Sequence, residues 1–287
     1  MSLSVENVRL TYGPGSVFAT EALKGVSFSL RAGEIVGLVG RTGSGKSSLL
    51  QVLAGLEPVD HGSVVLEGMS LYRKETDRQK LRRLVGISFQ YPEHQFFAET
   101  ITKELSFGLQ QQSLSNEEID ERIADSLRLV HLEQIKRERS PFELSGGQMR
   151  RLALATVFAM RPRYLLLDEP VAGLDPQSRS EILSCLSAYR QRHQAAVFFV
   201  SHSMEDIARI AERIVVLDRG KVLFDASPKE LFMQEELLLR AGLELPGVYT
   251  LLRELRALGI DIPAEPVWDL ETASRALEHY LQRAARR

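Results

Sequence analysis

A glycine-rich segment that ends in a lysine and a serine carries the strongest chemical signal in the sequence. In such a segment backbone N–H groups converge on phosphate oxygens, the lysine reaches the β- and γ-phosphates, and the serine ligates Mg²⁺. The segment lies between an apolar strand at 34–40 and a predicted helix at 47–54, whose N-terminus favours an anion. This context argues against a chance glycine-rich turn. The expected phosphate-binding residues are Gly40, Arg41, Thr42, Gly43, Ser44, Gly45, Lys46, Ser47 and Ser48.

Two adjacent carboxylates, Asp168 and Glu169, follow a second apolar strand at 164–167. At the end of such a strand Asp168 can complete a Mg²⁺ shell, and Glu169 can orient or deprotonate an attacking water. Two solvated acids are the alternative interpretation. The phosphate-binding loop in the same chain favours the catalytic one.

A second glycine-rich segment opens a predicted helix at 147–160, and it comprises Leu144, Ser145, Gly146, Gly147 and Gln148. A helix N-terminus of this kind is an anion site. Because the first loop already holds the phosphates of one nucleotide, a second anion site suggests a nucleotide shared with another copy. A plain N-cap with flexible glycines is the alternative. The 23 positions from Ser145 to Asp168 leave room for one helix and one strand, which favours the shared site.

The composition restricts the partners and the compartment. The net charge is −2, which argues against nucleic acid as a partner. A single cysteine, Cys185, allows no internal disulfide, and with no secretory signal recognised we expect a reducing cytosol. No apolar run approaches the roughly 20 residues of a membrane span. Any work at a membrane is therefore expected to depend on a partner.

Alternating apolar strands and helices must position these residues. Predicted strands at 85–89 and 196–200 and a predicted helix at 176–193 continue the pattern, which favours a mostly parallel sheet covered on both faces. A hairpin is expected around 218–221. The stretch 91–160 is helical in character, with a capping box at Ser115–Glu118, and we interpret it as an inserted helical subdomain.

The last part of the chain carries two amphipathic helical stripes, at 248–258 and 270–281, with a break between them. Two short helices cannot bury both faces alone. We therefore expect a main domain at 1–239 and a C-terminal helical extension at 240–287. The extension is predicted to assist dimerisation.

With these motifs in this order, the chain resembles the ABC transporter ATPase family over about residues 3–231. The resemblance implies a P-loop α/β domain that binds and hydrolyses ATP with Mg²⁺. It further implies that Gln90 senses Mg²⁺ and the attacking water, that His202 is a switch histidine on the γ-phosphate, and that the loop ending at Asp175 crosses a dimer interface. The segment 145–148 would contact the γ-phosphate held by the opposing subunit.

The resemblance also assigns an adenine-stacking aromatic residue. Tyr12 matches that position, and Phe18 competes with it because both belong to one loop. Tyr12 is favoured. Val171 replaces the more usual threonine and changes no catalytic assignment.

Within that family the chain resembles the energy-coupling factor transporter ATPases, and the second of their two paralogous types. The segments that carry this resemblance are Phe89–Phe97 with Glu99 and Thr100, Ser140–Arg151, and Leu245–Pro246. It implies two paired ATPases that drive a transmembrane coupling subunit, while another membrane subunit captures a vitamin or a metal ion. The chain would then be a peripheral protein on the cytoplasmic side of the cell membrane.

The segment after Gln90 is expected to form a coupling groove. Phe96 and Phe97 would supply apolar contact there, and exposed carboxylates of Glu93 and Glu99 would fix an arginine of a partner helix. The alternative is that the aromatic side chains belong to the core and the acids are merely solvated.

Several functional alternatives stay open at this stage. One is an ATPase of an ordinary binding-protein-dependent importer, and another is a non-transport ABC ATPase. The presence of Glu169 and His202 argues against a catalytically inactive partner. The transported substrate, and whether the partner ATPase is a second copy or a paralogue, do not follow from the sequence.

Overall fold

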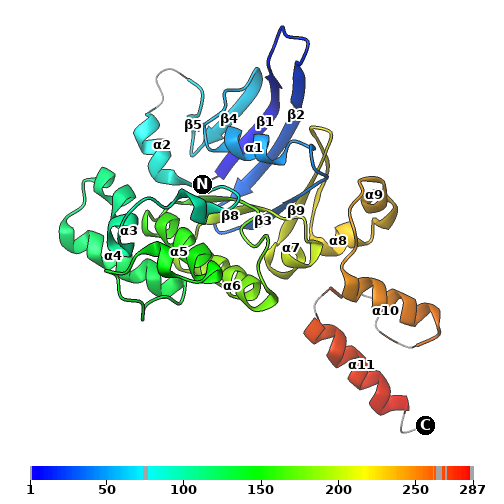
Figure 1. Ribbon diagram of the computed structural model, residues 1–287. Helices are drawn as coiled ribbons and strands as arrows, with labels where there is room; N and C mark the ends of the chain where they lie inside the picture. The colour runs from blue at the N-terminus through cyan, green and yellow to red at the C-terminus, as the bar shows by residue number, and fades with distance from the viewer. Residues whose placement is uncertain (1, 74–76, 261, 263–266, 269, 285–287) are drawn as a thin grey trace.

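A six-stranded sheet forms the centre of the part of the chain that the structure, a computed structural model, describes (Figure 1). The described residues are 2–73, 77–260, 262, 267–268 and 270–284. Five neighbouring strands run parallel, and β10 pairs antiparallel with β9. In spatial order the strands are β10 (Lys221–Ala226), β9 (Arg213–Asp218), β3 (Ile35–Val39), β8 (Ala196–Val200), β7 (Tyr164–Asp168) and β6 (Val85–Ser88).

Both faces of this sheet are covered, as the continuous apolar strands predict. Along β7, Tyr164 and Leu166 face one core, whereas Leu165 and Leu167 face the other. One face packs against α5 (Gly146–Ala159), α6 (Pro176–His193) and α7 (Met204–Ile210), and the other against α1 (Lys46–Leu53) (Figure 1). The predicted α/β fold with a mostly parallel sheet is confirmed.

The N-terminal strands form a second, antiparallel sheet that the sequence analysis did not separate from the first. It contains β2 (Thr20–Arg31), β1 (Ser2–Tyr12), β4 (His61–Leu66) and β5 (Met69–Ser70), in that order. Val26, Phe28 and Leu30 alternate towards its buried face. Phe28 stacks on Phe198 of the central sheet at 5.3 Å between ring centroids, which joins the two sheets in one core.

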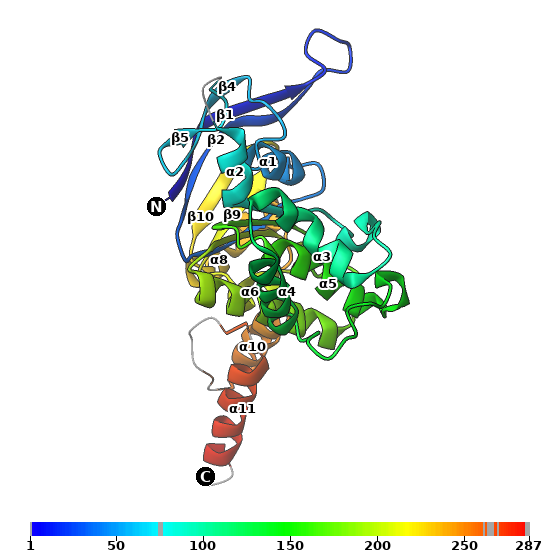
Figure 2. The same ribbon diagram turned by 90° about the vertical axis from the view of Figure 1, so that its left-hand side faces the viewer.

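The helices of the predicted insertion at 91–160 gather around α5 (Figure 2). They are η1 (Pro92–Gln95), α3 (Ile101–Leu109), η2 (Gln110–Gln112), α4 (Asn116–Leu129) and η3 (Pro141–Glu143), whereas α2 (Arg78–Leu84) precedes β6 and lies outside that stretch. The predicted capping box is present, with Ser115 Oγ accepting from Glu118 N and Glu118 Oε2 accepting from Ser115 N. The predicted hairpin is confirmed by the pairing of β9 with β10. Cys185 is buried in the α6 core.

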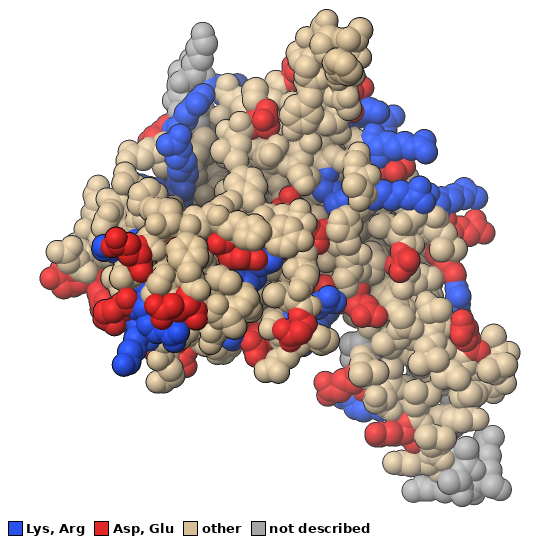
Figure 3. Space-filling view, in the orientation of Figure 1, with Lys and Arg blue, Asp and Glu red and all other residues tan. Residues whose placement is uncertain are grey.

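The C-terminal helices are α8 (Pro228–Phe232), α9 (Glu235–Arg240), α10 (Gly247–Ala257) and α11 (Leu270–Ala284). Ala241 and Leu243 lie in the main core, so that core continues past position 239. The last helix, α11, extends away from both sheets (Figures 1 and 2). Acidic and basic side chains both occur over the face shown in Figure 3. Among the described helices, none is both long and apolar enough to cross a membrane.

Candidate active site

A cleft of about 630 Å³ opens at the carboxyl ends of β3, β7 and β8, where parallel sheets bind their ligands. It brings together residues that the sequence analysis had placed in separate motifs. Those lining it include Tyr12, Thr42, Gly43, Gly45, Lys46, Ser47, Ser48, Gln90, Asp168, Glu169 and His202.

The glycine-rich loop between β3 and α1 wraps around the Lys46 ammonium. Gly45 has a φ of 103°, and a Cβ there would lie 2.6 Å from the Ala22 carbonyl oxygen, so glycine is required. Lys46 Nζ donates to Gly40 O at 2.6 Å and to Arg41 O at 3.0 Å. Burial lowers the pKa of Lys46, and the charges of Glu169 and Asp168 oppose that shift. The loop is thus folded around a cation that a phosphate can draw outward.

Two oxygen ligands meet beside this lysine. Ser47 Oγ donates to Asp168 Oδ2 at 2.8 Å, and Gln90 lines the same cleft. Mg²⁺ prefers oxygen ligands and usually binds to one or two protein groups plus substrate phosphates. The Ser47–Asp168 pair therefore fits a magnesium ion that is shared with a nucleotide.

Glu169 combines a buried carboxylate with an unusual backbone conformation. It is 6% exposed and has a φ of 51°, a left-handed conformation that non-glycine residues rarely adopt. Its Oε1 is buried and has only Nε2 of His202 as a close polar neighbour that the structure records among the described residues. Burial raises the pKa of Glu169 to about 7, the backbone of His202 opposes the rise, and the charge of Asp168 adds to it. A carboxylate with this pKa can exchange a proton near neutral pH.

His202 follows β8 and faces Glu169 across the cleft. Its Nε2 lies 3.1 Å from Glu169 Oε1. Burial, and then the charge of Lys46, lowers the pKa of His202, which favours a neutral imidazole at neutral pH. The histidine can therefore accept or donate a hydrogen bond at the same position that Glu169 reaches.

Tyr12 lies at the rim of the cleft. Its hydroxyl is 3.2 Å from both Ser48 Oγ and Gln51 Oε1, and its ring is partly exposed. Phe18 is 85% exposed and is not among the residues that line the cleft. Of the two aromatic candidates, Tyr12 is the one that the fold brings to the phosphate-binding loop.

The second glycine-rich segment lies outside this cleft. Ser145 Oγ accepts from Gln148 N, and Gln148 Oε1 accepts from Ser145 N, so the pair caps α5. Asp175 caps α6 by accepting hydrogen bonds from the backbone N–H groups of residues 177 and 178. Ser145, Gly146 and Asp175 are exposed. The chain does not bring these residues to its own Lys46.

The structure of the segment after Gln90 differs from the predicted coupling groove. Glu93 is not exposed for a partner, because its carboxylate is bound by the buried Arg150. Phe96 belongs to the core, whereas Phe97 is 62% exposed and contacts Phe107 edge to face at 4.9 Å. Glu99 is exposed and pairs with a lysine one helical turn away.

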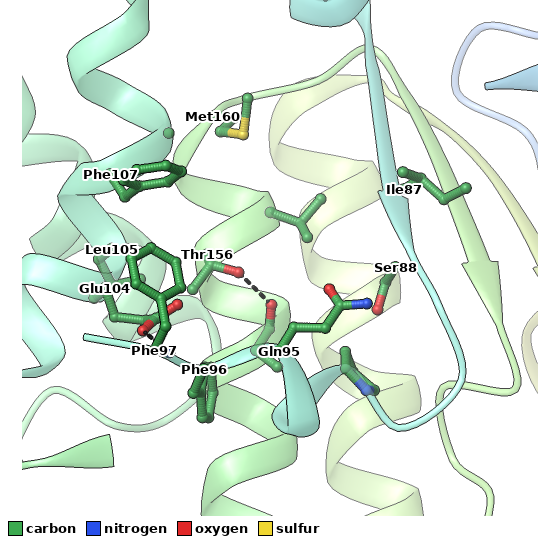
Figure 4. Close-up of a pocket in the computed structure, with 14 residues that line it drawn as sticks. Ile87, Ser88, Gln95, Phe96, Phe97, Glu104, Leu105, Phe107, Thr156 and Met160 are labelled. Carbon is green, nitrogen blue, oxygen red and sulfur yellow. Dashed lines mark hydrogen bonds between the residues drawn. The ribbon is translucent and has the colours of Figure 1, made fainter. Parts of the chain in front are cut away.

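A pocket of about 210 Å³ does exist beside this aromatic pair (Figure 4). Its wall is held by Glu104, whose Oε2 accepts from Phe97 N at 3.1 Å and from Ala98 N at 2.9 Å. Phe107 in this pocket and Arg219 in the cleft were not predicted from the sequence. Arg219 belongs to the predicted hairpin turn, but only the pairing of β9 with β3 brings that turn to the phosphate-binding loop.

Known proteins resemble the chain over nearly its full length. The ABC transporter family model matches residues 23–172. The energy-coupling factor transporter ATP-binding protein EcfA2 of Caldanaerobacter subterraneus subsp. tengcongensis is 43% identical, over 98% of this chain and 97% of the relative. The EcfA2 protein of Clostridium acetobutylicum is 39% identical over all of both chains.

Solved structures agree with these relatives. The structure of cbiO1 from Clostridium perfringens, part of the ABC transporter complex cbiONQ, has a TM-score of 0.75 and 30% identity, over 88% of this chain and 98% of that one. The dimeric cassette MJ0796 with ADP and Pi has a TM-score of 0.69 and 29% identity, over 79% and 98%. The chain therefore belongs to the ABC transporter family, and within it to the energy-coupling factor transporter ATP-binding proteins.

Proposed function

We propose that this chain is one of two ATPase subunits that power an energy-coupling factor importer. The observation that carries the proposal is a single cleft in which Lys46, the Ser47–Asp168 pair and the buried Glu169 converge. A cation, an oxygen pair for Mg²⁺ and a general base are the groups that ATP hydrolysis needs.

The residues of the cleft then have distinct roles in ATP hydrolysis. ATP phosphates draw Lys46 Nζ away from the carbonyl oxygens of Gly40 and Arg41. Ser47 and Asp168, with Gln90, would hold Mg²⁺, which when bound neutralises charge that develops on the phosphate oxygens. Glu169 accepts the proton of the attacking water through its carboxylate. His202 contacts the γ-phosphate and so reports its presence.

A second subunit completes the site. Residues 145–148 and Asp175 lie outside the cleft of their own chain, as expected for groups that act on a nucleotide bound by a partner. The cassette MJ0796 is dimeric in the structure with ADP and Pi, which supports the same arrangement. The C-terminal extension assists this pairing, because it exposes apolar side chains that a second subunit can cover. They are four leucines within or next to α10 and α11: Leu251, Leu258, Leu270 and Leu281.

Membrane subunits complete the importer. The exposed pair Phe97 and Phe107, next to the pocket of Figure 4, receives a helix of the transmembrane coupling subunit. A separate membrane subunit captures a vitamin or a metal ion. The relatives bear the name of transporter ATP-binding proteins, which supports a peripheral position on the cytoplasmic side of the cell membrane.

Coexpression with candidate membrane subunits tests this function. The assembled complex is expected to copurify and, in vesicles, to accumulate its substrate only with ATP and Mg²⁺. Glu169→Gln should still bind ATP but hydrolyse it about 10²- to 10⁴-fold more slowly, since a positioned base contributes that much. Near-normal hydrolysis by this variant would contradict the role of Glu169. Failure of every membrane subunit to copurify would contradict the transport role.

A further inference from the structure

The exposed surface of α2 on both flanks of Leu81 is cationic. Arg78, Lys80, Arg82 and Arg83 are all exposed on this helix, and we refer to these four residues as the basic stripe. Leu81 is buried and packs the helix against the core. Figure 3 shows Lys and Arg side chains gathered over α2, at the upper left of the view. The stripe stands out in a chain whose net charge is −2.

The charges of the basic stripe are not neutralised within the described residues, where none of the four forms an ion pair. The nearest described acid in the sequence, Asp77, is used as the N-cap and accepts from the backbone N–H groups of Gln79 and Lys80 at 2.9 and 3.0 Å. Other arginines of the chain are paired with acids: Arg128, Arg161 and Arg192 all contact Asp125. The basic stripe is thus a local positive field available to an external anion.

A hollow of about 260 Å³ lies between the basic stripe and the end of α3. Arg82, Arg83 and Gln79 line it from α2, and the opposite wall consists of Gly108, Gln111, Gln112 and Met160. Gly108 and Met160 also line the pocket beside Phe97 and Phe107. The basic stripe therefore borders the surface that receives the membrane subunit in the proposed function.

We propose that the basic stripe binds anionic lipid headgroups, with one headgroup phosphate entering the hollow between Arg82 and Arg83. This inference depends on the proposed function for one point only, which is that this side of the chain faces the bilayer. Clustered Lys and Arg side chains beside a membrane surface are attracted to anionic lipids. Guanidinium groups match phosphate geometry with two parallel hydrogen bonds.

The surface of α2 favours lipid over an acidic protein segment. Protein interfaces are rich in aromatic side chains and poor in lysine at their centre. The exposed positions of α2 carry Arg78, Gln79, Lys80, Arg82 and Arg83, with no aromatic or aliphatic side chain among them. Lipid headgroups are mobile, so binding to them requires long cationic side chains on the protein rather than a complementary apolar patch.

Vesicle cosedimentation of the purified full chain tests the proposal, and the membrane subunits are left out. Phosphatidylcholine vesicles are compared with vesicles of equal parts phosphatidylcholine and phosphatidylglycerol. We expect binding to the anionic vesicles alone, and weaker binding at higher salt. The variant Arg78→Gln/Lys80→Gln/Arg83→Gln should bind at least about tenfold more weakly, since each cation near the surface contributes several-fold to the affinity.

A variant of equal net charge controls for the loss of three cations. Arg31→Gln/Lys136→Gln/Lys221→Gln removes exposed cations that lie far apart in the sequence, and it should bind anionic vesicles nearly as the wild type does. Unchanged thermal melting and ATP hydrolysis show that both variants fold. Equal losses in the two variants would overturn the basic stripe as the site.

Three other results would overturn the lipid proposal. One is equal binding of the wild type to neutral and anionic vesicles. Another is saturable binding of inorganic phosphate by a chain that ignores anionic vesicles. The third is loss of complex assembly in the α2 variant when the wild type does not bind vesicles, which would indicate an acidic protein partner. Because the vesicles contain no protein, a failed transport assay leaves this test unaffected.

Discussion

Arg150 and Glu93 form a buried ion pair between helix α5 and the segment that follows Gln90. Arg150 Nη2 donates to Glu93 Oε1 at 2.9 Å, and Nε lies 2.7 Å from Oε2, with the two side chains 3% and 14% exposed. The same guanidinium donates to the carbonyl oxygens of Pro170 and Ala172 and lies 5.3 Å from the centroid of the Tyr91 ring. One side chain thus connects the helix opened by Ser145 to the loops that carry Gln90 and Glu169.

Arg150→Met should destabilise the chain strongly. Removing one partner of a buried pair leaves the other charge uncompensated, at a cost of about 3–5 kcal/mol. Urea denaturation measures the free energy of unfolding. The double variant Arg150→Met/Glu93→Gln should recover part of the loss, because it leaves no unpaired charge. Arg139→Met breaks the more exposed pair with Glu143 and serves as the control. The assignment is wrong if Arg150→Met unfolds at the same urea concentration as the wild type.

Glu169→Gln should stabilise the nucleotide-free chain in a pH-dependent way. The pKa of Glu169 is about 7 in the folded chain and ordinarily 4.5, so between these values only the unfolded chain loses the proton. The wild type therefore loses stability as the pH rises through this range, whereas the glutamine variant does not.

The advantage of the Glu169→Gln variant should grow from about pH 4.5 to about pH 7 and stay level above, reaching on the order of 1–3 kcal/mol. Urea denaturation at about pH 5 and about pH 8 measures this difference. A difference that does not depend on pH would show that burial of the charge is not what shifts this pKa.

Tyr12→Ala should weaken ATP binding more than Phe18→Ala does. Stacking of a base on an aromatic ring contributes about 1–3 kcal/mol, which corresponds to roughly 5- to 150-fold in affinity. Tyr12→Phe keeps the ring and loses only the hydroxyl contacts with Ser48 and Gln51, so it should bind ATP nearly normally. Equilibrium titration with a fluorescent ATP analogue compares the variants. Equal losses for Tyr12→Ala and Phe18→Ala would remove the distinction between the two residues.

Phe97→Ala/Phe107→Ala should reduce assembly with the membrane subunits and the rate of transport. The two rings form the exposed apolar surface next to the pocket of Figure 4, and neither lines the hydrolytic cleft. Basal ATP hydrolysis is therefore expected to stay within about twofold of the wild type. Leu223→Ala removes a partly exposed side chain from β10 and is the matched control. Normal copurification of the double variant would place the docking surface elsewhere.

Leu258→Glu/Leu270→Glu should weaken pairing of the ATPase subunits without changing nucleotide binding. Both leucines are exposed, at 79% and 72%, while Leu252 is buried in a small cluster of the extension itself. Substitution is preferable to deletion after position 239, because Ala241 and Leu243 belong to the main core. Sedimentation velocity measures the dimer, with Met233→Glu as an exposed control. If the dimer is unaffected, the extension does not contribute to pairing through these leucines.

Local patterns in the sequence determined the elements and most of the chemistry. The spacing of glycines before Lys46, the apolar strand before Asp168 and Glu169, and the capping box at Ser115 are each contained in a few consecutive residues. Strand and helix periodicities are equally local, so the parallel sheet and the β9–β10 hairpin could be predicted. The resemblance to the ABC transporter ATPase family, rather than local periodicity, suggested Tyr12 over Phe18 as the aromatic residue of the cleft.

Only the tertiary structure decided which of these segments meet. Ser47 and Asp168 are 121 positions apart, and their contact depends on β8 lying between β3 and β7. Glu93 looks like a solvated acid in the sequence, but the packing of α5 gives it a buried guanidinium partner. The ring of Phe107 contacts the ring of Phe97 because α3, which carries Phe107, packs beside the segment that carries Phe97. Contacts of this kind depend on strand order and helix packing, which are set by the free energy of the whole core rather than by neighbouring residues.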